Sequence, residues 1–171
     1  MKGDRAEGGR MEGDRNGGGR KGRAGTDQTR KGILLLRSFL IGVVMALVWG
    51  AVSSLLTLDR LIPGSAGEMM FTRPIAFQLI FYGFVSPVLE EVLFRKLLYD
   101  LAVRILPHQA AAVLVSALFA LWHGDLIQML YAFPAGLILQ MLRARSGTIK
   151  QPVLCHIGAN LTAILVTALI P

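Results

Sequence analysis

Long apolar stretches alternate with short polar breaks along most of the chain. A helix needs about 20 predominantly apolar residues to cross the hydrocarbon core of a bilayer. Five stretches approach this length, and Pro, Gly or charged residues separate them. They cover approximately residues 33–58, 74–99, 109–123, 126–142 and 152–170. The pattern predicts an all-α protein, a polytopic transmembrane helical bundle of about five spans, in which the third span is the shortest.

The first 32 residues do not follow this pattern. They hold ten of the 19 glycines and almost no apolar side chains. Such a segment cannot bury enough apolar surface to offset the entropy lost on ordering. We therefore expect residues 1–32 to form a disordered basic tail and residues 33–171 to form the transmembrane domain.

Composition and charge support a membrane protein with a defined orientation. Hydrophobic residues make up 53% of the chain and charged residues only 17%, against about 25% charged in soluble domains, which excludes a soluble enzyme. The net charge is +7, and in membrane proteins an excess of Lys and Arg fixes orientation. The basic clusters precede the first span and follow the second and fourth spans. This placement predicts a cytoplasmic N-terminus and no role in nucleic-acid binding.

The second span contains ionisable side chains at Glu90, Glu91 and Arg95. Ionisable groups inside a membrane are costly, so they suggest function by default. Glu91 and Arg95 are four residues apart and can pair on one helix face, which could also be a purely structural salt bridge. Glu90 lies about 100° further round the helix and has no partner at helical spacing. Pro87 removes a backbone hydrogen bond just before this cluster.

Two further polar clusters lie in later spans. Phe119 and His123 end the third span, and His156 and Asn160 lie four residues apart in the last one. Taken singly, they could be an interface histidine and a helix–helix hydrogen bond, worth about 1 kcal/mol in membranes. Together with the acids, they make a constellation that can activate water, with a carboxylate–imidazole base and donors for an oxyanion.

The spacings EExxxR, FxxxH and HxxxN occur in this order, each on its own span. With the intervening stretch HGDLIQMLYAFPAGLILQ, they resemble the CPBP family (CAAX protease and bacteriocin-processing, or ABI, proteins), in its bacterial branch. This family consists of intramembrane endopeptidases and includes the CAAX prenyl endopeptidase. The resemblance covers about residues 74–167. It implies that residues 33–171 are a CPBP-type protease domain with its active site within the membrane, in a bacterial plasma membrane.

The resemblance also implies catalytic roles for four side chains. Glu90 would activate the attacking water with the help of His123. His156 and Asn160 would stabilise the oxyanion of the tetrahedral intermediate. The expected reaction is hydrolysis of a peptide bond in a membrane-associated peptide or protein.

Three further motif residues receive supporting roles from the same resemblance. Glu91 with Arg95 would support the site or help to hold the substrate. Phe119 would pack beside the base and line the substrate groove. Only one span precedes the EExxxR helix and none follows the HxxxN helix, so a homodimer could complete the cavity wall.

No cofactor is favoured by the sequence, and zinc is the alternative. Glu90, His123 and His156 could serve as three zinc ligands, and three protein ligands plus water is the usual catalytic pattern. The sequence lacks an HExxH helix, and a metal-free Glu–His pair requires fewer assumptions. We therefore expect a glutamic mechanism.

The alternative function is non-catalytic. A membrane protein of this type could bind and sequester a peptide without cleaving it, for instance in bacteriocin self-immunity. The presence of all three of Glu90, His123 and His156 favours the enzyme, because a protein without activity would be expected to have lost at least one of them. The expected partners are the lipid bilayer and a peptide or protein substrate.

Overall fold

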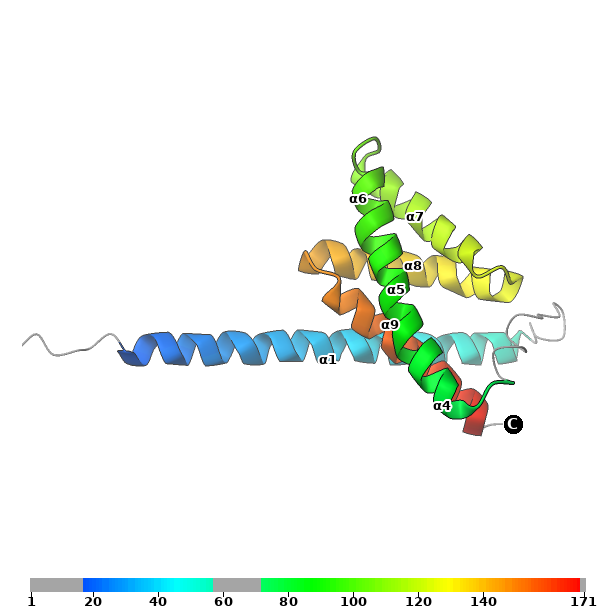
Figure 1. The fold of residues 1–171 in the computed structure, drawn as a ribbon, viewed down its shortest axis with the longest axis horizontal. Coiled ribbons are helices and arrows are strands. Elements are labelled where there is room, and N and C mark those ends of the chain that lie inside the picture. The colour runs from blue at the N-terminus through cyan, green and yellow to red at the C-terminus, as the bar shows by residue number, and fades with distance from the viewer. Residues whose placement is uncertain (1–16, 57–71, 170–171) are drawn as a thin grey trace, which may run out of the picture. The chain divides into compact units, whose positions relative to one another are not determined.

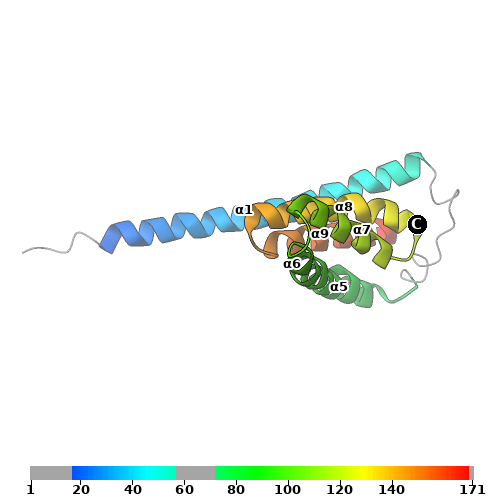
Figure 2. The ribbon, with the colours of Figure 1, turned by 90° about the horizontal axis from the view of Figure 1, so that it is seen from above.

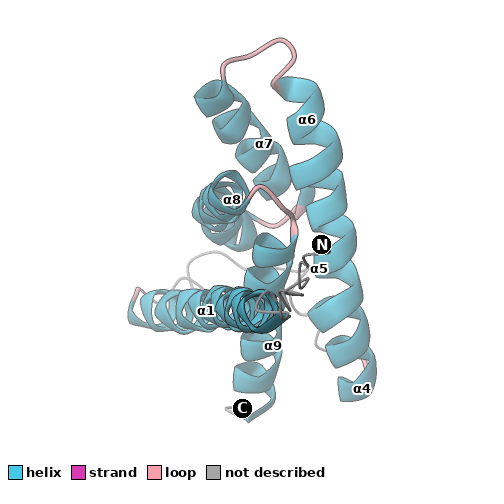
Figure 3. Ribbon diagram, turned by 90° about the vertical axis from the view of Figure 1, so that its left-hand side faces the viewer, coloured by secondary structure: helices cyan, strands magenta, loops and turns pink. Residues whose placement is uncertain are grey.

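The computed structural model describes residues 17–56 and 72–169, with side chains from residue 27 onward. Within these ranges the chain forms helices, turns and short loops without strands (Figure 3). This confirms the predicted all-α class. The separate helices, also labelled in Figure 1, are α1 (Gly17–Leu55), α7 (His108–Trp122), α8 (Leu126–Ser146) and α9 (Lys150–Leu169). A continuous helical run contains α4 (Ile75–Phe77), η1 (Gln78–Val85), α5 (Ser86–Glu91), η2 (Val92–Leu98) and α6 (Tyr99–Ala102).

Several of these helices are suited to a bilayer. Four are long and apolar enough to cross a membrane, namely Asp27–Leu55, Ile75–Ala102, Leu126–Ser146 and Lys150–Leu169. Helix α7 is also apolar but has only 15 residues, in line with the short third span that the sequence predicts. Large apolar side chains are exposed along all five segments, as expected for surfaces that face lipid. The chain is a multi-pass membrane protein.

The chain divides into two units, Met1–Ile33 and Leu34–Pro171. The structure differs from the predicted disorder over residues 17–32, because helix α1 already begins at Gly17. An established helix extends at the cost of ordering one residue for each hydrogen bond gained. An ion pair of 2.7 Å between Asp27 and Lys31, four residues apart, supports this extension. Residues 1–16 lie outside the described part.

Helix packing in the second unit brings distant parts of the sequence together. Helices α7 and α8 pack against each other, and α9 packs against both α8 and the helical run, an arrangement visible from above in Figure 2. Figure 3 shows α9 beside this run. The core between these helices contains the buried residues Phe94, Ala102, Ala111, Val115, Phe119, Ala120, Ala132, Leu139 and Cys155.

Local sequence signals set the ends of α8. Asp125 precedes the helix, and its side chain accepts a hydrogen bond of 3.0 Å from the Gln128 amide, as a helix N-cap does. At the other end Gly147 has a φ of 67°, and its amide donates to the Arg143 carbonyl at 2.9 Å. Glycine adopts this left-handed conformation without a steric penalty. These two signals determine where α8 begins and ends.

The helical run is π-helical on both sides of α5. In a π-helix the amide of residue i+5 bonds the carbonyl of residue i, and in η1 the Ser86 amide accordingly donates to the Phe81 carbonyl. The next carbonyl, that of Tyr82, would pair with residue 87. Pro87 has no N–H, so the Tyr82 carbonyl has no π-helical donor. This carbonyl is therefore open to a side chain from another helix.

Glycines on α1 and α9 allow the two backbones to approach closely. A Cβ atom added to Gly158 would collide with the Phe39 carbonyl, and one added to Gly42 would collide with the Cys155 carbonyl. Small residues at such contacts are typical of helix association in membranes, where close packing rather than the hydrophobic effect holds helices together.

We expect Gly158→Ala to destabilise the protein by about 1–3 kcal/mol, because the added methyl group meets backbone that cannot turn away. The measurement is the free energy of unfolding in detergent micelles. Gly50→Ala is the matched control, since no atom lies within 4 Å of its added Cβ; its alanine should leave stability unchanged or raise it by up to about 1 kcal/mol. Equal effects of both substitutions would contradict this account of the α1–α9 contact.

Candidate active site

Glu90 lies on α5 with its two carboxylate oxygens in different environments. The Ser86 hydroxyl donates a hydrogen bond of 2.5 Å to Glu90 Oε1. Glu90 Oε2 is buried without a hydrogen-bond partner among the described residues, 3.7 Å from His156 Nε2. The prediction that Glu90 has no partner at helical spacing is wrong, because it considered charged groups and overlooked the hydroxyl one turn earlier. One oxygen is thus anchored, and the other makes no hydrogen bond to the described residues.

The predicted pair between Glu91 and Arg95 is present. Arg95 Nε lies 3.2 Å from Glu91 Oε2, and both side chains are at most 1% exposed. Arg95 Nη2 also donates to the Gly136 carbonyl on α8 at 3.2 Å. The guanidinium carbon lies 4.2 Å from the centre of the Phe119 ring, within the range of a cation–π interaction. Arg95 therefore joins the helical run to both α7 and α8.

His156 on α9 lies between the two glutamates. Its Nδ1 is 3.0 Å from Glu91 Oε1, and since an ionised carboxylate can only accept, Nδ1 carries the hydrogen. Nε2 then lies on the side of Glu90. A carboxylate that orients an imidazole in this way is typical of catalytic bases and their supporting groups.

The imidazole beside Glu90 is therefore that of His156, whereas the sequence analysis paired Glu90 with His123. Within the described residues no hydrogen bond or ion pair joins Glu90 to His123. The reason is local: His123 follows the last residue of α7, and its Nδ1 lies 2.8 Å from the Phe119 carbonyl. Because a carbonyl only accepts, Nδ1 carries the hydrogen, and the neutral ring has its lone pair on Nε2.

Asn160 lies one turn after His156 on α9. Its Nδ2 donates at 2.9 Å to the Tyr82 carbonyl, the group that Pro87 leaves without a π-helical donor. An amide group has two N–H bonds, so one remains for another acceptor. The contact fixes Asn160 against η1 and leaves it one donor.

Phe119 on α7 lies at the centre of the group. It is 2% exposed, and its ring makes edge-to-face contacts with His123 and His156, with centroids 4.9 and 5.6 Å apart. Such pairs favour one relative orientation of the rings. The Phe119 side chain therefore contacts Arg95 and both imidazole rings.

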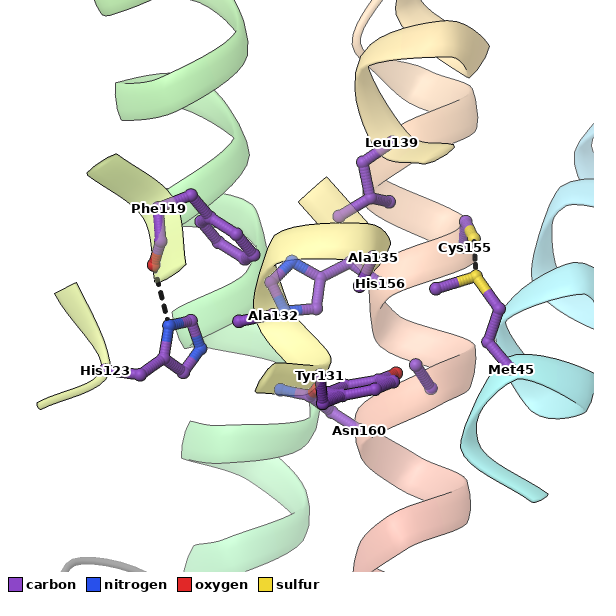
Figure 4. A pocket seen from close by; sticks show the side chains of 11 residues that line it. Met45, Phe119, His123, Tyr131, Ala132, Ala135, Leu139, Cys155, His156 and Asn160 are labelled. Carbon is purple, nitrogen blue, oxygen red and sulfur yellow. Dashed lines mark hydrogen bonds between the residues drawn. The ribbon is translucent and has the colours of Figure 1, made fainter. Parts of the chain in front are cut away.

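A small cavity of about 30 Å³ opens beside these residues (Figure 4), with room for one or two water molecules. Its polar lining includes His123, Tyr131, His156 and Asn160. Glu90, Glu91 and Arg95 do not line it, so the structure brings the motif residues together as a cavity wall and a buried layer. The apolar lining residues are Met45, Phe119, Ala132, Ala135, Leu139 and Ala159, together with the buried Cys155.

Tyr131 also lines the cavity and was not among the residues predicted from the sequence. Its ring packs against that of Trp49 on α1, with centroids 5.5 Å apart. Tyr131, Ala135 and Leu139 are spaced four residues apart and line the cavity from α8. That spacing, with one polar aromatic among small and apolar residues, is the signal in the sequence that could have found this face.

A zinc site built from Glu90, His123 and His156 does not fit this structure. In the described part of the chain, no three His, Cys, Asp or Glu side chains are grouped so that they could hold a metal ion.

Fold and site together define a polytopic membrane protein with a buried carboxylate–imidazole cluster next to a water-sized cavity. The profile of the family described as "Type II CAAX prenyl endopeptidase Rce1-like" matches residues 72–162, more than half of the chain. This range includes every candidate site residue. The chain belongs to the Rce1-like family of CAAX-type membrane proteases, which confirms the resemblance seen in the motifs.

Two relatives illustrate the similarity. The chain is 28% identical over 88 residues to YdiL of Bacillus subtilis (strain 168), a proposed membrane peptidase, covering 52% of this chain and 36% of YdiL. It is 21% identical over 134 residues to MroQ of Staphylococcus aureus (strain USA300), a membrane-embedded CAAX protease, covering 75% of this chain and 51% of MroQ. The matches thus span about half or less of each relative. No solved structure gives a significant match.

Proposed function

We propose that this protein is an intramembrane endopeptidase that hydrolyses a peptide bond in a membrane-associated peptide or protein. Membership of a membrane protease family supports the reaction class. The observation that carries the proposal is Glu90, a carboxylate with one oxygen anchored by Ser86 and the other buried, unbonded and next to an imidazole. A general base for water needs a carboxylate oxygen that no other donor occupies, and Glu90 Oε2 meets this requirement.

In the proposed reaction Glu90 accepts a proton from water while the water oxygen attacks the carbonyl carbon of the scissile bond. The C–N bond then breaks, and the proton on Glu90 passes to the leaving amine. The lone pair on His123 Nε2 faces the cavity side (Figure 4) and can accept a hydrogen bond from the attacking water. The Ser86 contact keeps the Glu90 carboxylate in one orientation, which lowers the entropic cost of reaching the transition state.

The oxyanion would be stabilised from α9. Asn160 is fixed by the Tyr82 carbonyl and has a second N–H to offer. His156 donates to Glu91 through Nδ1 and, when protonated on both nitrogens, can offer its Nε2 hydrogen to the oxyanion. Preorganised donors of this kind contribute a large part of the rate enhancement in acyl transfer. Glu91, Arg95 and Phe119 hold these groups in place, and Phe119 also lines the cavity.

We propose the bacterial plasma membrane as the location, with the N-terminus in the cytoplasm. The positions of the basic clusters support this orientation through the positive-inside rule. The natural partners would be the lipid bilayer and a peptide or protein substrate. A homodimer is a further expectation, which the oligomeric state in mild detergent would test.

A cleavage assay tests the proposal and its metal dependence together. Purified protein in detergent is incubated with a library of membrane peptides, and new termini are identified by mass spectrometry. We expect cleavage that persists after chelation and metal removal, because the candidate ligands are not grouped as a metal site. Loss of cleavage on chelation, with recovery on adding zinc, would contradict the metal-free mechanism. An absence of cleavage by folded protein would favour the non-catalytic peptide-binding alternative.

A further inference from the structure

Arg143 on α8 lies outside the three motifs, yet it contacts the helical run that carries Glu90, Glu91 and Arg95 at two points. Its Nε donates to the Arg95 carbonyl at 2.7 Å, and its Nη2 donates to Asp100 Oδ1 at 2.8 Å. The Arg143 side chain is 18% exposed and that of Asp100 is 50% exposed. Two charge-assisted hydrogen bonds hold this long side chain in one conformation, and they connect α8 to the helical run.

The Arg95 carbonyl, which accepts from Arg143, lies within the π-helical segment η2. In an α-helix the Tyr99 amide would bond this carbonyl. Here the Tyr99 amide donates to the carbonyls of Phe94 and Lys96 instead. Arg143 supplies a side-chain donor to the Arg95 carbonyl, as Asn160 does to the Tyr82 carbonyl in η1. Each π-helical segment is thus tied by a side chain from a following helix.

Both the guanidinium and the backbone carbonyl of Arg95 are consequently hydrogen-bonded to α8. Its guanidinium donates to the Gly136 carbonyl of α8, while its own carbonyl accepts from Arg143 of the same helix. The guanidinium also contacts Glu91 at 3.2 Å, and Glu91 contacts His156 at 3.0 Å. A chain of direct contacts therefore leads from Arg143 to the imidazole beside Glu90.

We propose that Arg143 is a positioning residue of the site, and that it sets the orientation of His156 through Arg95 and Glu91. This inference rests on the proposed peptidase function only for its effect on rate. Arginine suits the role because one edge of its planar guanidinium reaches a carbonyl and a carboxylate together. A lysine ammonium at this position keeps the charge but has no such fork.

The test compares Arg143→Lys with Arg145→Lys, a control that makes the same change at an exposed position two residues further along α8. In Arg143→Lys we expect a fall in kcat of about ten- to a hundredfold with KM within about twofold, because small misplacements of reacting groups affect chemistry more than binding. Arg145→Lys should match the wild type in both constants.

Nuclear magnetic resonance provides a readout that does not depend on activity. The chain has three histidines, so ring nitrogen signals of labelled protein in detergent can be assigned by single substitutions. We expect the His156 signals to shift in Arg143→Lys and to stay in place in Arg145→Lys. Unshifted His156 signals in Arg143→Lys overturn the proposal, even if kcat falls, since the effect would then bypass His156.

If the wild type cleaves no peptide, the proposed function fails, while the His156 signals still decide the role of Arg143. If Arg143→Lys does not fold, Asp100→Asn takes its place, because it keeps the acceptor oxygen but removes the charge that holds Arg143. A smaller shift of the His156 signals is expected there, and no shift would overturn the proposal.

Discussion

Replacing Glu90 with glutamine is expected to lower kcat for peptide cleavage by about 10²–10⁴-fold, the usual contribution of a general base. The amide keeps the size of the side chain and an oxygen that can accept from the Ser86 hydroxyl. It cannot accept a proton from water at neutral pH. The fold should therefore persist while the reaction is lost, which is measured by cleavage of a defined peptide alongside the thermal unfolding of the purified variant.

Asp125→Asn is the matched control for this experiment. It makes the same acid-to-amide change at a helix N-cap outside the site, and asparagine caps helices about as well as aspartate. Activity and stability should both stay close to those of the wild type. Cleavage by Glu90→Gln at the rate of this control would show that another group activates the water.

Replacing Arg95 with methionine is expected to cost about 3–5 kcal/mol of unfolding free energy, because it leaves the Glu91 carboxylate buried without its charge partner. The substitution also removes the hydrogen bond to the Gly136 carbonyl and the contact with the Phe119 ring. The measurement is a denaturant titration of the variant in detergent micelles. Activity should fall together with stability, because Arg95 pairs with Glu91 and Glu91 orients His156.

Two comparisons make this result specific. Lys31→Met breaks an ion pair with the same four-residue spacing, but its side chains are 70% and 62% exposed, so the expected cost is at most about 1 kcal/mol. Combining Arg95→Met with Glu91→Gln removes the unpaired charge and should recover part of the lost stability. A single Arg95→Met variant as stable as Lys31→Met would contradict the role of the buried pair.

Features that depend on local sequence could be predicted well. The apolar stretches anticipated the ends of α7 and the start of α8 to within a residue or so, because Pro, Gly and charged residues interrupt the apolar pattern there. The pair of Glu91 and Arg95 followed from their four-residue spacing. Both inferences use only neighbours along one helix.

Features that depend on packing between helices could not be predicted in the same way. From the sequence, either His123 or His156 could lie beside Glu90. That it is His156 depends on how α9 packs against the helical run. The π-helical segments add to the difficulty, because arguments from 3.6 residues per turn do not hold through them. The contact between Asn160 and Tyr82 needs both the π-helical register and the missing N–H of Pro87.

The size of the cavity has a consequence for how tightly a substrate can bind. Ligand pockets commonly enclose about 300–1,000 Å³, whereas this cavity encloses about 30 Å³. A peptide backbone can enter this cavity only in a conformation in which the surrounding side chains or helices have moved apart. The apparent dissociation constant is then the intrinsic one divided by the fraction of molecules that are open. A substitution that loosens the packing around the cavity would therefore strengthen apparent substrate affinity while it weakens the fold.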